Sequence, residues 1–309
     1  MTEETSGPEP PRGRRKWVSH GLSNSVVYGG LFYGATRLPM AVLQGINLVG
    51  NSIAVVTLRQ TVAGIADNFE KALSVPRRQA RRMARRLFFE YGRATIDTWR
   101  ARSGRPELQP CFSRFHETDR ALKGATDGGK GFLLVSAHFG NWEMGAVSLR
   151  AHGFVPAVLG QPELDPRVHE MRLAVRKQLG VESIDIGSSM ATSLRVRAAV
   201  EKGWVVALVA DRAYEDDHVV VPFFGRPTRF LRSPALLARF CDCAILPGFF
   251  MRNADGSYEG GFGDPLRADP ALDPAADAAR IMAEVARTLE REIRRRPTQW
   301  FNFFRYWPG

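Results

Sequence analysis

The sequence predicts an α/β fold, with a mixed central sheet covered by helices on both faces. Short apolar runs such as Phe132–Ala137 and Trp204–Ala210 are typical of strands that are buried on both sides. Segments with helical spacing lie between these runs, and several end at a glycine, as at Gly153, Gly180 and Gly203. Strand and helix signals that alternate along a chain favour a sheet packed between two layers of helices.

The predicted elements follow one another from Gly131 onward. Strands are expected at residues 132–137, 155–159, 183–186, 204–210 and 244–251. Helices are expected at residues 142–152, 166–179, 188–202, 233–241 and 274–296.

Length and composition bound the domain organisation. The chain has 309 residues, 44% of them hydrophobic, which is enough for a full core. We divide it into a basic-ended, disordered tail (1–16), an apolar region with amphipathic helices (17–60) and one α/β body (61–309). The three cysteines do not form a disulfide framework, since the count is odd.

The region after the tail is nearly free of charge. Residues 17–58 carry one formal charge, Arg37, and residues 38–58 are about long enough to cross a ~30 Å hydrocarbon core. Its polar residues gather on one helical face: Gln44, Asn47, Asn51 and Ser52. Apolar residues form a stripe on another: Val42, Ile46, Val49, Ile53 and Val56. This pattern favours a helix that lies in a membrane interface or on the protein body, with a spanning helix and a buried core helix as alternatives.

The net charge of +11 predicts an anionic partner. Ten arginines lie between Pro76 and Pro106, against only Glu90 and Asp97. Arginines beside apolar stretches are typical of a membrane surface. Nucleic-acid binding rests on charge alone, and no recognised module supports it, so we expect no nucleic-acid partner.

One stretch combines position, turn chemistry and reactive groups. His138 directly follows a predicted strand, at the sheet edge where α/β proteins bind ligands. Gly140 permits a tight turn, Asn141 can cap the next helix, and Glu143 falls in its first turn. Across such a turn the Glu143 carboxylate can reach the His138 imidazole.

A histidine held by a carboxylate is suited to general-base catalysis. We expect His138 to deprotonate an acceptor hydroxyl that attacks an activated acyl group directly, with Glu143 holding the imidazole. Loop amides and the helix N-terminus are candidates for stabilising the oxyanion. Arg229, with Arg226 and Arg232, is a candidate for holding acceptor phosphates. The alternative, that these three arginines are ordinary surface residues, explains them equally well.

The stretch Ser136–Glu143 (SAHFGNWE) resembles the H-x4-[D/E] signature of glycerolipid and lysophospholipid acyltransferases, in the branch that acylates lipid A. Weaker similarities run from about residue 20 to 307: the Arg176-x-x-x-Gly180 step, the strand end at Ala210-Asp211, VPFFGRPT at 221–228 and the terminal PTQWFNFFRYW.

The resemblance implies an enzyme on the cytoplasmic face of the bacterial inner membrane, with residues 61–309 as its acyltransferase domain. It would move a fatty acyl chain from an acyl-carrier protein or acyl-CoA thioester to a lipid A-type glycolipid or a lysophospholipid. It implies His138 as base and Glu143 as its partner, with Arg176 and Asp211 shaping the site. We expect no metal and no bound cofactor.

The rival hypothesis is a basic, membrane-peripheral scaffold that keeps the fold without the chemistry.

A second motif, residues 124–131, nearly spells a phosphate-binding loop. It precedes a strand rather than a helix and lacks the Ser or Thr that binds magnesium, so we reject it.

Overall fold

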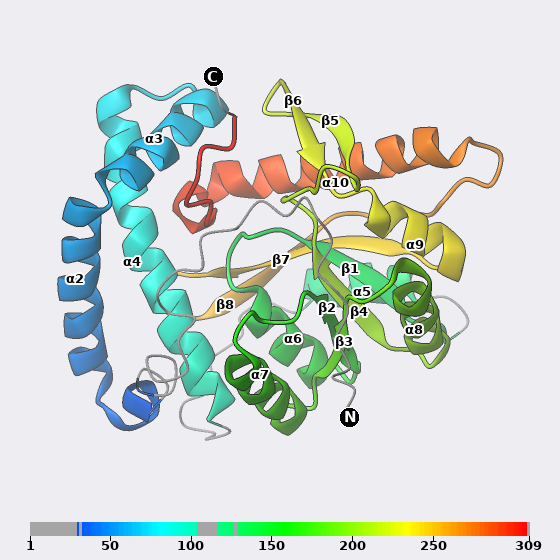
Figure 1. The fold of residues 1–309 in the computed structure, drawn as a ribbon, viewed down its shortest axis with the longest axis horizontal. Helices are drawn as coiled ribbons and strands as arrows, with labels where there is room; N and C mark the ends of the chain where they lie inside the picture. The colour runs from blue at the N-terminus through cyan, green and yellow to red at the C-terminus, as the bar shows by residue number, and fades with distance from the viewer. Residues whose placement is uncertain (1–29, 31–32, 104–115, 127–128, 308–309) are drawn as a thin grey trace, which may run out of the picture.

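The structure is a computed structural model that describes residues 30, 33–103, 116–126 and 129–307 (Figure 1). The predicted tail (1–16) and the start of the apolar region lie outside these residues. The helices are α2 (Met40–Thr57), α3 (Arg59–Leu73), α4 (Arg77–Arg102), α5 (His116–Ala125), α6 (Trp142–Ala151), α7 (Pro166–Gln178), α8 (Ser189–Glu201), α9 (Ser233–Cys241), α10 (Pro274–Arg295) and the 3-10 helix η3 (Pro297–Gln299). The strands are β1 (Phe132–Ser136), β2 (Pro156–Gly160), β3 (Glu182–Asp185), β4 (Val205–Val209), β5 (Val219–Phe223), β6 (Arg226–Phe230), β7 (Ile245–Arg252) and β8 (Tyr258–Phe262).

Six strands form the central sheet, in the order β3-β2-β4-β1-β7-β8. The first five run parallel, and β8 pairs antiparallel with β7. The predicted mixed sheet is therefore confirmed. Because β1 and β4 are parallel neighbours with Ser136 opposite Val209, the residues that follow these two strands also come side by side.

Each face of the sheet packs against its own helices. Leu133 and Val135 of β1 face a core shared with α3, α4, α8, α9 and α10. Phe132 and Leu134, which point the other way, pack against α5 and α6. β1 is buried along its whole length, as its continuous apolar sequence predicts. In Figure 1, α6 and α7 lie below the sheet and α10 crosses above it.

The predicted strands and helices are found within one or two residues of their expected ends. Two β elements were not predicted: the β5–β6 hairpin and the edge strand β8. The β5–β6 hairpin contains Pro222 and Pro227, and β8 contains Gly260 and Gly261. These residue types lower strand propensity, and pairing with a neighbouring strand overrides it here.

Helix α2 runs along α4 at the edge of the molecule (Figure 1). Asn47 donates a hydrogen bond to the carbonyl of Phe89 on α4 (3.2 Å), so this residue of the predicted polar face points toward the protein, whereas Gln44 and Ser52 are exposed. Leu43 is the one buried residue of α2, which excludes a core helix. Among the described residues, α2 is the one helix whose length and composition would allow it to cross a membrane.

Candidate active site

The loop between β1 and α6 carries the predicted reactive residues. Gly140 adopts a positive φ of 68°, and a Cβ at this position would lie 2.1 Å from the carbonyl oxygen of Phe250. Asn141 caps α6 by accepting a hydrogen bond from the amide of Met144 (3.3 Å). Both parts of the predicted turn chemistry are confirmed. The loop places His138 and Glu143 at the carboxyl edge of the sheet.

The His138 ring is hydrogen-bonded to Asp211, the residue two positions after β4. The distance from Nδ1 to Asp211 Oδ1 is 2.7 Å, and the same oxygen accepts the backbone N–H of His138 (3.1 Å). Asp211 is buried, whereas 19% of the His138 side chain is exposed. A carboxylate at Nδ1 fixes the tautomer that leaves Nε2 unprotonated and able to act as a base.

The electrostatics keep the imidazole neutral and the carboxylate charged. Burial lowers the pKa of His138 below its ordinary 6.5, although Asp211 opposes this shift. Burial alone would raise the pKa of Asp211, but His138 and Arg212 together hold it below its usual range. At neutral pH the pair is therefore an unprotonated imidazole beside an ionised carboxylate.

Glu143 binds two arginines. One of its oxygens accepts hydrogen bonds from Arg172 (3.2 Å) and Arg176 (3.0 Å), both on α7. Asp211 supplies a carboxylate contact to the His138 ring, and the expected contact of Glu143 with this ring stays a prediction. Glu143 lies at the same site as an arginine-bound carboxylate, and a role for Glu143 as a catalytic partner stays a prediction.

A cavity of about 290 Å³ lies beside these residues. It is formed by the α6-facing side of the sheet and by α6 and α7. Its lining includes apolar and small residues: Leu134, Ala146, Val158, Gly160, Ala207, Val209 and Phe250. It also includes polar and charged residues: His138, Glu143, Glu163, His169, Arg172, Arg176 and Asp185.

Three of the apolar lining residues lie on neighbouring strands of the sheet. Leu134 pairs with Ala207, and Ala207 with Val158, so these three side chains form one row across the sheet. That row lies four residues before His138, or about 13 Å at ~3.3 Å per residue. The cavity can hold an extended apolar chain whose reactive end lies beside the imidazole.

The loop amides do not fit the expected oxyanion role. The N–H of Phe139 donates to Ala137, that of Gly140 to Gln299 and that of Asn141 to Phe250. With the His138 amide bound to Asp211, all four amides are already used. Arg176 is the better candidate donor, because its Nε is buried without a hydrogen-bond partner among the described residues and the side chain lines the cavity.

The remaining predicted site residue lies apart from this group. Arg229 is exposed on β6, outside the described lining of the cavity. Arg172 was not predicted, although its position four residues before Arg176 places both on one face of a helix. No group of three or more His, Cys, Asp or Glu suited to a metal ion occurs in the part of the chain that the structure describes.

The geometry defines an α/β protein with a histidine–aspartate pair at the carboxyl edge of its sheet, beside an apolar cavity. The family model described as bacterial lipid A biosynthesis acyltransferase matches residues 29–308. The chain therefore belongs to this family, as the SAHFGNWE stretch predicted.

Individual relatives are more distant. The phosphatidylinositol mannoside acyltransferase of Mycobacterium tuberculosis is 30% identical over 184 residues, which cover 58% of this chain and 55% of the relative. The enzyme of the same name from Mycolicibacterium smegmatis is 28% identical over 182 residues, covering 58% and 57%. The chain thus spans little more than half the length of the curated relatives it matches. The crystal structure of a 1-acyl-sn-glycerophosphate acyltransferase from Thermotoga maritima covers 83% of this chain, with 12% identity and a TM-score of 0.40.

Proposed function

We propose that this protein is a membrane-associated O-acyltransferase. It moves a fatty acyl chain from an acyl-carrier-protein or acyl-CoA thioester to a hydroxyl of a membrane glycolipid or a lysophospholipid. The observation that carries the proposal is the His138 imidazole, which is bound to a buried carboxylate and lines a cavity that also has apolar lining residues. Family membership supports acyl transfer to lipid.

The chemistry follows from the protonation states. The Nε2 of His138 takes the proton of an acceptor hydroxyl as that oxygen attacks the thioester carbonyl. The imidazolium that forms is stabilised by Asp211, and it gives its proton to the thiolate leaving group as the C–S bond breaks, which restores the neutral base. Ser136 also lines the cavity, but its hydroxyl has no hydrogen-bond partner within the described residues, so no base activates it as a nucleophile.

Helix α2 supports a location at the membrane. Its outer face exposes the apolar stripe predicted from the sequence, with Ile46 at 52% and Ile53 at 59% exposure. On the neighbouring helix α4, Arg78, Arg81, Arg82 and Arg85 are exposed and take part in no ion pair among the described contacts. An apolar stripe beside unpaired arginines fits the interface of an anionic bilayer, with α2 lying along the surface. We propose the cytoplasmic face of the inner membrane, where thioester donors occur.

The deciding experiment measures thiol release with His138→Ala. Palmitoyl-CoA and palmitoyl-acyl-carrier protein serve as donors. A mannosylated phosphatidylinositol, a lipid A precursor and a lysophospholipid serve as acceptors. We expect a loss of about 10²–10⁴-fold in turnover, the range that a general base contributes. A folded variant with wild-type turnover would exclude the mechanism, and a wild-type protein that binds vesicles but consumes no thioester with any acceptor would support the scaffold alternative.

A further inference from the structure

Asn141 holds the loop through one buried side-chain amide. Its Oδ1 accepts from the amide of Met144, and its Nδ2 donates to the carbonyl of Ala94 (3.0 Å) and to the hydroxyl of Tyr258 (3.2 Å). The Thr98 hydroxyl lies 3.1 Å from Asn141 Oδ1 and 2.9 Å from the Ala94 carbonyl, and it has one proton to donate to one of these two oxygens. Capping a helix uses only the bond from Met144, and the other contacts fasten the loop to α4 and β8.

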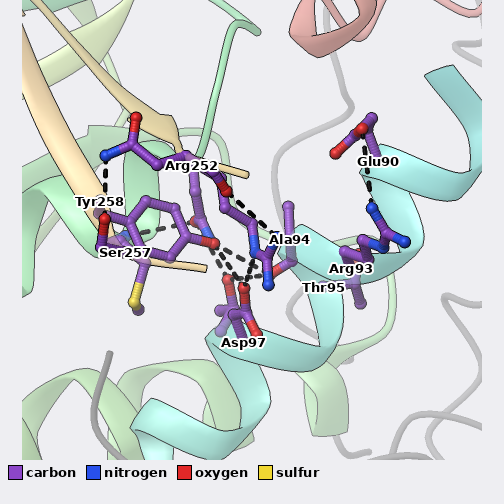
Figure 2. A network of polar contacts seen from close by, with 12 residues as sticks. Glu90, Arg93, Ala94, Thr95, Asp97, Arg252, Ser257 and Tyr258 are labelled. Carbon is purple, nitrogen blue, oxygen red and sulfur yellow. Dashed lines mark hydrogen bonds and ion pairs between the residues drawn. The ribbon is translucent and has the colours of Figure 1, made fainter. Parts of the chain in front are cut away.

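Tyr258 links Asn141 to a partly buried ion pair. Its hydroxyl donates to Asp97 Oδ2 on α4 (2.8 Å), and the same oxygen accepts from the Nε of Arg252 at the end of β7 (2.7 Å). Figure 2 shows the Tyr258 and Arg252 side chains converging on Asp97. Burial raises the pKa of Tyr258, so its hydroxyl keeps its proton and remains a donor.

The contacts return to the loop by a second route. The side chain of Gln299 in η3 binds the backbone of Arg252 at both ends, accepting its N–H (3.0 Å) and donating to its carbonyl (2.7 Å). The backbone carbonyl of Gln299 accepts the N–H of Gly140 (2.9 Å). Asn141, Tyr258, Asp97, Arg252, Gln299 and Gly140 thus form a closed ring of polar contacts, which we call the loop ring.

We propose that Tyr258 and Asp97 are positioning residues for acyl transfer, which act through Asn141 to hold His138 and Glu143 at their working separation. This inference rests on the proposed function. The described lining of the cavity includes neither Tyr258 nor Asp97, so neither touches the substrates there. Tyr258 is fully buried on β8, and its hydroxyl binds both Asp97 of α4 and Asn141 in the loop between His138 and Glu143. A displacement of about 1 Å at a reacting group can cost 10²-fold in rate, which is why this support matters.

The test replaces Tyr258 by Phe, which keeps the ring and removes the bridging hydroxyl. We expect kcat for thiol release from palmitoyl-CoA or palmitoyl-acyl-carrier protein, whichever the wild type consumes, to fall roughly 10-fold, with KM for the donor near wild type. The acidic limb of the pH–rate profile should not move, because no charge beside His138 changes. A wild-type kcat would overturn the proposal, and so would a loss that appears in KM alone.

A double-mutant cycle separates positioning from general destabilisation. Asn141→Ser retains a helix cap but loses the amide that reaches Tyr258. In this background Tyr258→Phe should cause no further loss of kcat, whereas full additivity would overturn the proposal.

Two threonines of α4, Thr98 and Thr95, provide a matched pair of substitutions that each remove one hydroxyl. Thr98→Val removes a hydroxyl bound to Asn141 and should lower kcat. Thr95→Val removes one that lies 2.9 Å from the Tyr91 carbonyl and should not. Equal effects of the two substitutions would contradict the loop ring.

The His138→Ala variant distinguishes failure of the proposed function from failure of the positioning role. If it keeps its turnover, the proposed function fails whatever Tyr258→Phe does. If it is inactive while Tyr258→Phe matches the wild type, only the positioning role fails.

Discussion

The loop at residues 138–143 and helix α2 both come from strongly patterned sequence, but the fold treats them in opposite ways. Each backbone N–H from His138 to Asn141 donates to an acceptor within the protein, and the Asn141 side chain is bonded through both its oxygen and its nitrogen. In α2 only Leu43 is buried, while Ile46 and Ile53 each expose more than half their surface. The loop is organised from within before any substrate arrives, whereas the outer face of α2 finds no apolar partner among the described residues.

The difference separates two kinds of experiment. Substitutions around the loop should change the rate of the chemical step and leave vesicle binding intact. Substitutions on the outer face of α2 or on α4 should change vesicle binding and leave the chemical step intact. The largest effects are expected for substitutions that change the chemical step, and the smallest for substitutions that change membrane binding.

The largest effect is expected for Asp211→Asn. An amide at this position can no longer stabilise the imidazolium and favours the wrong tautomer of His138, so kcat should fall by about 10³–10⁴-fold. Thiol release by the purified protein measures it. Asp242→Asn, which changes an exposed carboxylate at the C-terminal end of α9, serves as the control. A loss in the control equal to that of Asp211→Asn would contradict the assignment.

A smaller effect is expected when the Glu143–Arg176 contact is broken. Glu143→Gln removes the charge that holds two cavity-lining arginines, and Arg176→Ala removes the candidate oxyanion donor. Each should lower kcat by roughly 10- to 100-fold, and the double variant should lose less than the product of both. Arg197→Ala, from an exposed ion pair on α8, should have no effect. Multiplicative losses in the double variant would show that the two side chains act independently.

The role of the exposed apolar face of α2 in membrane binding is tested by Ile53→Glu. Burial of an isoleucine in the acyl region contributes about 1.5 kcal/mol or more, so the affinity for anionic vesicles should fall about 10-fold. Val220→Glu is the matched control, because Val220 has a similar exposure of 54% but lies on the β5–β6 hairpin. Co-sedimentation with vesicles measures both variants. Equal losses would remove α2 from the membrane contact.

The smallest effect is expected for Arg82→Ala on α4. A basic residue near an anionic surface contributes about 1 kcal/mol, which corresponds to roughly 5-fold in vesicle affinity at low salt. Vesicles of purely zwitterionic lipid should show no change. A loss of the same size on neutral vesicles would mean that the residue acts through packing instead of charge.

Much of the fold could be predicted, because parallel strands that are buried on both faces have continuous apolar sequences. The run from Phe132 to Ala137 is continuous and apolar since both faces of β1 are covered. Strand β8 could not be predicted, because its glycines carry no periodic signal and its partner β7 determines its conformation. The predicted polar face of α2 is divided in the structure: Asn47 contacts α4, whereas Gln44 and Ser52 are exposed.

At the site, local turn chemistry was predictable and long-range pairing was not. Gly140 and Asn141 act within a few residues of where they lie in the sequence. The Asp211–His138 contact depends on β4 lying beside β1, and no spacing along the chain reports that order. The loop ring has the same origin: Asp97 and Tyr258 are 161 residues apart in the sequence.

The most direct test of the central claim is the pH dependence of single-turnover acyl transfer in the wild type and in Asp211→Asn. The rate depends on unprotonated His138, so it should rise with pH through the pKa of this residue. That pKa lies below 6.5, because burial disfavours the charged imidazolium. Asp211 raises this pKa, so its replacement by Asn should move the acidic limb to still lower pH while the plateau falls. A limb at or above 6.5 in the wild type, or one that moves upward in Asp211→Asn, would contradict His138 as the general base held by Asp211.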